Sequence, residues 1–133
     1  MILPTDTIVA VADGEKLSLF RNTGTEISMS LTAAPEPEVE AATASASGHH
    51  SSAANPDDKQ VAEDGFAKSI TEMLNQQVLT HGVTNVVVIA APRTLGEMRK
   101  HYHKKLEDVL LREISKDLTG HSVADIEKTI LAA

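Results

Sequence analysis

The sequence predicts an α/β domain: a mixed sheet with an N-terminal antiparallel three-stranded part and a parallel fourth strand, covered by three helices. Short alternating segments separated by turn residues open the chain, a long stretch of helical spacing follows, and a continuous apolar run of strand length comes next. A helix that leads into an apolar strand is typical of a crossover between parallel strands. The 133 residues fit a single domain, 1–133.

The first two strands are predicted to form a hairpin. Residues 7–11 are rich in β-branched side chains, and residues 16–21 alternate apolar and polar. Between them, Asp13 and Gly14 favour a tight turn because both residue types tolerate a positive φ. We therefore interpret Asp13 as a turn residue. The alternative is a metal or catalytic carboxylate at the end of the first strand, for which the sequence shows no matching carboxylate cluster.

The third strand is predicted at residues 26–31, after a second turn at residues 22–25. From about 32 to 56, Ala, Ser, Thr, Pro and Glu dominate, so this segment is predicted to be a disordered acidic loop rich in alanine and serine. His49 and His50 lie within it without further ligands, and we predict no metal there.

A long helix is predicted at residues 57–80, with Gly82 as its left-handed cap. Residues 85–91 are apolar without alternation, as in a central strand buried on both faces. We expect this strand to lie parallel to an earlier one. The apolar residues at helical spacing in the preceding helix are Val61, Phe66, Ile70, Met73, Leu74, Val78 and Leu79.

A second long helix is predicted to begin at Thr94, because Thr94 and Glu97 have the spacing of a capping box. A stop at residues 118–120 and a cap at Ser122 introduce a short final helix. The apolar side of the second long helix is predicted to consist of Leu95, Met98, Tyr102, Leu106, Val109 and Leu110. The final helix carries Val123, Ile126, Ile130 and Leu131.

Composition narrows the function classes. The chain has no cysteine, which excludes disulfides, cysteine metal sites and thiol nucleophiles. No apolar run approaches the roughly 20 residues of a membrane helix, and the first residues lack the features of a signal peptide, so we expect a cytoplasmic protein without membrane contact. The charge is unevenly distributed along the chain. The net charge is -7, yet most lysines and arginines follow Pro92, which predicts a local basic surface.

The candidate binding site is the junction between the central strand and the basic helix, at residues 91–94. Ligands of open α/β sheets bind at such junctions, and free amides at a helix start attract anions. The alternative for the arginine at this junction is pairing with a carboxylate. The residues predicted to bind phosphate or a partner are Arg93, Thr94, Arg99, Lys100, His103 and Lys104.

Catalytic signatures are missing. The sequence has no phosphate loop, no dinucleotide-binding fingerprint and no His-Glu-x-x-His helix. His101 and His103 turn well apart on a helix, so we interpret them as polar helix residues. We predict no catalytic residue, metal or cofactor.

Five segments of the chain resemble the host attachment protein family, bacterial proteins described as required for attachment to host cells. The segments are residues 11–15, 20–22, 66–68, 91–100 and 116–121. This family is similar to the middle domain of archaeal and eukaryotic release factors and of Pelota, a ribonuclease H-like fold. The resemblance implies that fold and an approach to ribosomal or transfer RNA through basic residues. It also implies no peptide release, because release factors use a Gly-Gly-Gln tip and this chain has no adjacent glycines.

Three functional hypotheses follow. The first is a non-catalytic cytoplasmic factor that acts indirectly in host attachment, with RNA or the ribosome as its partner. The second is a protein-interaction module whose basic helix docks an acidic partner. The third is a small metal-dependent hydrolase or nuclease that uses Asp13 and another acidic residue.

Overall fold

The structure is a computed structural model that describes residues 1–34 and 56–133. Its strands and helices follow the chain as β1 (Ile8–Ala12), β2 (Leu17–Asn22), β3 (Leu31–Ala33), α2 (Pro56–Thr80), β4 (Val86–Ala90), α3 (Pro92–Arg99), α4 (Lys104–Val109), β5 (Leu110–Ser115) and α5 (Val123–Ala132). The described part of the chain thus has five strands and four helices, against the four strands and three helices predicted.

One mixed sheet forms the centre of the molecule, with the strand order β3-β2-β1-β4-β5. The β1–β2 and β2–β3 pairs are antiparallel, whereas β1–β4 and β4–β5 are parallel. The predicted fold class is confirmed: an antiparallel N-terminal part joins a parallel strand, and that strand pairs with β1.

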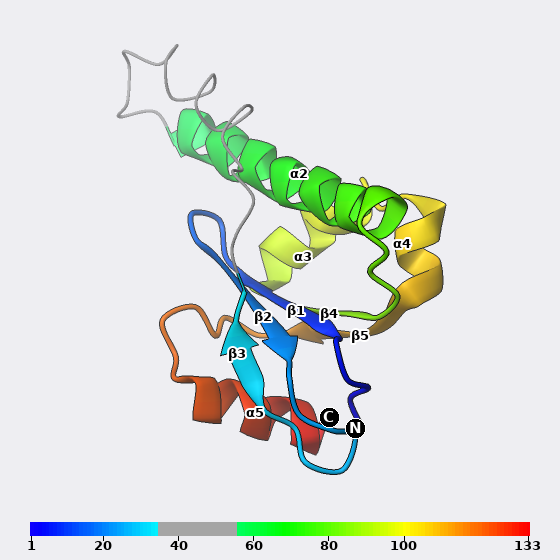
Figure 1. The fold of residues 1–133 in the computed structure, drawn as a ribbon. Coiled ribbons are helices and arrows are strands. Elements are labelled where there is room, and N and C mark those ends of the chain that lie inside the picture. The colour runs from blue at the N-terminus through cyan, green and yellow to red at the C-terminus, as the bar shows by residue number, and fades with distance from the viewer. Residues whose placement is uncertain (35–55) are drawn as a thin grey trace.

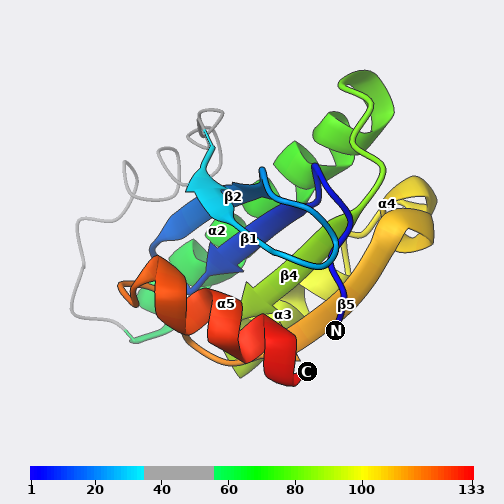
Figure 2. The ribbon, with the colours of Figure 1, turned by 60° about the horizontal axis from the view of Figure 1, so that its bottom comes forward.

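Helices cover both faces of the sheet (Figure 1). Helices α2, α3 and α4 lie on one face, and α5 crosses the other, as the rotated view in Figure 2 shows. The alternation along β1 explains both layers: Ile8 and Ala10 pack with the first three helices, whereas Val9 and Val11 pack with α5. The strands β1 and β4 are buried throughout, as expected for central strands with helices on both sides.

The third strand differs from the prediction. Strand β3 covers Leu31–Ala33, so the predicted strand at 26–31 is wrong except for its last residue, and Ile27 is 99% exposed. The preceding loop is held by Asn22, whose Oδ1 accepts hydrogen bonds from the amides of Gly24 and Ser30, each 3.0 Å long. These hydrogen bonds occupy amides that a longer strand would need for pairing.

The loop predicted at 32–56 is shorter at both ends. Residues 32 and 33 belong to β3, and Pro56 already belongs to α2. Most of that loop, including His49 and His50, lies outside the described residues.

The prediction of a second long helix from Thr94 is also wrong. Helix α3 ends at Arg99, α4 is short, and Leu110–Ser115 forms β5 parallel to β4. Residues 110–115 suit a helix by residue type, but pairing with β4 outweighs that weak local preference. Four of the apolar residues named for the predicted helices are exposed: Val61, Leu79, Val123 and Leu131.

Candidate functional site

The carboxyl ends of β1 and β4 lie side by side, where Ala12 pairs with Ala90. The amide of Ala91 donates to the carbonyl of Ala12 at 3.2 Å, which extends the pairing by one residue. The β1–β2 turn and the start of α3 therefore meet at the same edge of the sheet. This is the edge at which ligands of open α/β sheets bind.

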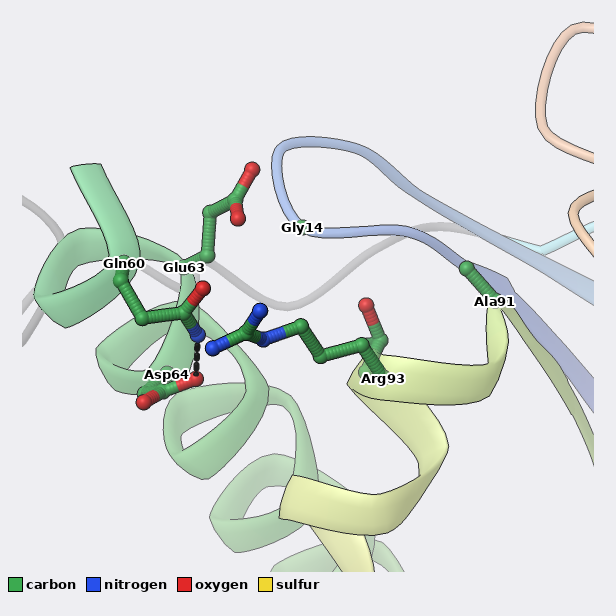
Figure 3. Close-up of a pocket in the computed structure, with 7 residues that line it drawn as sticks. Gly14, Gln60, Glu63, Asp64, Ala91 and Arg93 are labelled. Atoms are coloured by element: carbon green, nitrogen blue, oxygen red, sulfur yellow. Dashed lines mark hydrogen bonds between the residues drawn. The ribbon is translucent and has the colours of Figure 1, made fainter. Parts of the chain in front are cut away.

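A pocket of about 160 Å³ opens at this edge between α2 and α3. Arg93 extends across it toward Gln60 and Asp64 of α2, and Glu63 extends toward the β1–β2 turn (Figure 3). Glu63 comes so close to Gly14 that a Cβ at that position would lie 2.8 Å from the Glu63 carboxyl carbon. The sequence prediction found Arg93 but missed the side of the pocket that α2 forms. We call this side the α2 wall; it consists of Gln60, Glu63 and Asp64. The only signal for that wall is the i, i+3 and i+4 spacing of these polar residues on one helix face.

The predicted capping box at the start of α3 is wrong. The helix begins two residues earlier, with Ala91 as N-cap and Pro92 in the first turn, and no side chain caps it. Proline suits that position because its fixed φ is helical and it has no amide to satisfy. Thr94 is instead buried inside the helix and lines the pocket.

Arg99 is paired with a carboxylate of β5. Its Nε lies 3.1 Å from both carboxylate oxygens of Glu113, and the Tyr102 hydroxyl donates to the same carboxylate at 2.8 Å. Partial burial alone would raise the pKa of Glu113, but the hydrogen bonds from Arg99 and Tyr102 outweigh burial and hold this pKa below its ordinary value. Burial and the neighbouring carboxylate raise the pKa of Tyr102. Glu113 is therefore ionised and Tyr102 neutral at physiological pH.

Lys100 is also paired with a carboxylate. Its Nζ lies 2.8 Å from Glu97, and this contact is the main reason that the pKa of Glu97 is lowered. The His101 ring lies 3.9 Å from the other oxygen of Glu97.

His103 caps the next helix. It lies with His101 in the segment between α3 and α4, so the prediction that both are helix residues is wrong. The His103 Nδ1 accepts from the Lys105 amide at 3.0 Å, and the His103 amide donates to Asn75 of α2 at 3.0 Å. These bonds join the segment to α2 and start α4.

The predicted site thus separates into three groups. Arg93 and Thr94 line the pocket, Arg99 and Lys100 are held by carboxylates, and His103 is a cap beside the exposed Lys104. Within residues 1–34 and 56–133, five exposed cations from α4 onward have no ion-pair partner: Lys104, Lys105, Arg112, Lys116 and Lys128.

Asp13 is a turn residue, as predicted, but the backbone of the turn differs from the predicted conformation. Neither Asp13 nor Gly14 has a positive φ; instead the Asp13 Oδ1 accepts from the amides of Glu15 and Lys16 at 2.7 and 2.6 Å. Its Oδ2 accepts from the Thr119 hydroxyl at 2.8 Å, so the turn is tied to the loop after β5. Burial opposes ionisation of Asp13, but these hydrogen bonds prevail and lower its pKa.

Two further features concern the part of the chain that the structure describes. It holds no group of three or more His, Asp or Glu side chains placed to bind a metal ion. It also contains no helix with the length and apolar character needed to cross a membrane.

The strand order and the helices on both faces define the class of protein, an α/β domain with a mixed five-stranded sheet between helices. The chain matches the bacterial archaeo-eukaryotic release factor family 12 over residues 6–130 and belongs to that family. This match confirms the release-factor part of the resemblance, whereas its description does not mention host attachment. No curated protein matches the chain.

Proposed function

We propose that this release-factor-like protein is a non-catalytic cytoplasmic factor that binds RNA, in the ribosome or in transfer RNA, through phosphate contacts. The family relationship supports a link to translation. No adjacent glycines are present in the sequence, so the proposal assigns no peptide-release chemistry to it. Any effect on attachment to host cells is then indirect, through RNA or the ribosome.

The observation that carries the proposal is the group of exposed cations on α4 and β5. Lys104 and Lys105 open α4, and Arg112 lies on the edge strand β5 that follows directly. These side chains are exposed and form no ion pair within the described residues, so no carboxylate has to be displaced before they meet a phosphate. Lysine and arginine in this role contact the backbone and position the protein without reading base sequence.

The basic surface proposed here differs from the predicted one. Arg99 and Lys100 keep carboxylates beside them, and a phosphate that approached either cation would also meet Glu113 or Glu97. A net charge of -7 further restricts polyanion binding to a local surface. We therefore assign the main phosphate contacts to Lys104, Lys105 and Arg112.

Binding to purified ribosomes and to transfer RNA across a salt series tests the proposal. The variant Lys104→Ala/Lys105→Ala/Arg112→Ala should bind more weakly, with a slope of log K against log salt that is shallower by about 2 to 3, because each lost phosphate contact removes roughly 0.7 to 0.9. The matched control Lys16→Ala/Lys59→Ala/Lys68→Ala removes the same charge from the β1–β2 turn and α2 and should leave the slope unchanged.

Two outcomes contradict the proposal. The first is absence of binding at low salt. The second is equal weakening of both variants, which would reflect net charge alone. In either case the second hypothesis, docking of an acidic protein partner on the basic surface, becomes the better explanation.

A further inference from the structure

We propose that the pocket between α2 and α3 binds a small zwitterion, a free α-amino acid, whose carboxylate lies at the start of α3 and whose ammonium lies beside Glu63 and Asp64. This site is distinct from the cations on α4 and β5, and it does not depend on RNA binding. It lies at the carboxyl ends of β1 and β4, where the pocket is lined by groups of both charges.

The start of α3 provides the part of the site that binds the carboxylate of the ligand. The first amides of a helix have no partner within it, and the helix dipole adds a partial positive charge there. In this helix Pro92 has no amide, and no side chain caps the turn. The amides of Arg93 and Thr94 make no hydrogen bond within the described residues, since the first bond back to the N-cap is that of Leu95 to Ala91 at 2.9 Å. Two amide donors are thus available to one carboxylate, and the Arg93 guanidinium adds positive charge to the same pocket.

The side chain of Thr94 is an independent indication of a ligand. Thr94 is only 7% exposed and lines the pocket, yet its hydroxyl has no hydrogen-bond partner in residues 1–34 and 56–133. Buried hydroxyls are nearly always satisfied, because an unmet one costs about 1 to 3 kcal/mol. The other buried threonines follow that rule: Thr7 donates to Pro4 at 2.7 Å and Thr71 to Ala67 at 2.9 Å. A ligand oxygen at the start of α3 would supply the missing partner of Thr94.

The α2 wall provides the part of the site that binds the ammonium group of the ligand. Asp64 accepts a hydrogen bond from Gln60, and Glu63, the residue before it, extends toward the β1–β2 turn; both carboxylates line the pocket (Figure 3). Neither carboxylate forms an ion pair in the described part of the chain, although Arg93 points toward Asp64. An ammonium group between Glu63 and Asp64 would compensate both charges.

The mixed charge of the pocket selects the ligand. A phosphate at the start of α3 would face two carboxylates, and a simple amine would face the Arg93 guanidinium. A zwitterion places each of its charges against the opposite one. The volume of about 160 Å³ resembles that of a cavity that admits benzene, which corresponds to a molecule of roughly six to ten non-hydrogen atoms. Small α-amino acids have this size and both charges.

Nuclear magnetic resonance titration of the full chain with each of the twenty standard L-amino acids tests the proposal. We expect at least one of them to shift the amide signals of Arg93 and Thr94 with a Kd of about 10 mM or tighter. For that amino acid, the analogues without the amino group and without the carboxyl group should each bind at least about tenfold more weakly, because each loses one of the two charge contacts. The absence of any shift, or a shift of these signals by inorganic phosphate alone, would overturn the proposal.

Variants locate the site. Thr94→Val keeps the shape of the side chain and removes the hydroxyl, and Asp64→Asn keeps the shape and removes the charge; each should weaken binding by about tenfold. Arg93→Ala, at an exposed side chain, should do the same and serves if Thr94→Val does not fold. Lys116→Ala, outside the pocket, is the control and should bind as the unchanged protein does. Equal binding by Arg93→Ala and Lys116→Ala would place the ligand elsewhere and sink the assignment.

Discussion

Arg99 holds Glu113 at both carboxylate oxygens, with Nε 3.1 Å from each oxygen and Nη2 3.0 Å from Oε1. The contact joins the end of α3 to the edge strand β5. A side chain that the sequence marks as part of a basic surface therefore stabilises the position of the last strand. Tyr102 completes the cluster through its hydroxyl.

Tyr102→Phe should lower the free energy of unfolding by about 1 to 2 kcal/mol, because it removes a hydrogen bond to an ionised carboxylate while keeping the ring. Urea denaturation at pH 7 measures the change. Ser115→Ala removes an exposed hydroxyl that makes no hydrogen bond within the described residues and is the control, with an expected change within about 0.5 kcal/mol. An unchanged stability of Tyr102→Phe would show that the bond contributes nothing.

Stability should fall in acid through Glu113. Because the folded protein holds the pKa of Glu113 below its ordinary value of 4.5, the stabilisation is complete above that value and is lost as the pH falls through the lower folded pKa. Glu113→Gln should therefore be less stable than the unchanged protein at pH 7, and the gap should narrow below pH 4.5. Denaturation midpoints of both proteins from pH 7 to pH 3 measure this difference in stability. A gap that stays constant with pH would contradict the assignment.

Asn22→Ala should be strongly destabilising. The buried Asn22 amide donates to the carbonyl of Leu3 at 2.9 Å, and its oxygen accepts from the amides of Gly24 and Ser30. Removing the side chain leaves several backbone groups without partners, with an expected loss of about 2 to 4 kcal/mol. Thermal unfolding compared with that of Gln76→Ala tests this, because the Gln76 side chain is exposed on α2 and makes no hydrogen bond within the described residues. Similar losses in both variants would argue against a special role of Asn22.

Two glycine replacements should have opposite signs. Gly82 has φ 70°, so Gly82→Ala should lower stability by about 1 kcal/mol through left-handed strain. Gly96 lies within α3, and a Cβ there meets no atom within 4 Å, so Gly96→Ala should raise stability by about 0.5 to 1 kcal/mol. Chemical denaturation of both variants provides the comparison. The same sign for both would contradict the backbone explanation.

Much of the fold could be predicted where local pattern and tertiary environment agree. The first hairpin, the long helix, the buried strand β4 and the caps at Gly82 and Ser122 all have local signals that packing reinforces. Ser122 caps α5 as expected, by accepting from the amide of Asp125. The parallel pairing of β4 with β1 followed from the crossover rule.

The C-terminal half could not be predicted from local pattern because helix and strand compete there. Leu106, Val109 and Leu110 continue the helical spacing of α3, and only Leu106 and Val109 lie in a helix. What ends α3 is a long-range contact: Asn75 of α2 accepts from the His103 amide and donates to the carbonyl of His101. No sequence window around residues 100–103 contains that partner.

The candidate site shows the same division. The junction at the end of β4 was predicted from general rules of α/β sheets, and Arg93 and Thr94 do line a pocket there. The carboxylates that face them come from α2, which is distant in sequence, and the partners of Arg99 and Lys100 depend on where β5 and α3 lie. A count of basic residues cannot distinguish a cation that is free from one that is already paired.

The central place of β1 has a consequence for how the protein is made. Its neighbour β2 follows directly, whereas its other neighbour β4 pairs Val86 with Ile8 and leaves the ribosome much later. Domains fold as the chain emerges, N-terminal part first, so the hairpin exists for a time with one edge of β1 unpaired. An open edge of valine and isoleucine readily accepts a foreign strand. The nascent chain is thus most vulnerable to aggregation until Val86–Ala90 has emerged, and a ribosome that stalls before that point would leave this edge exposed.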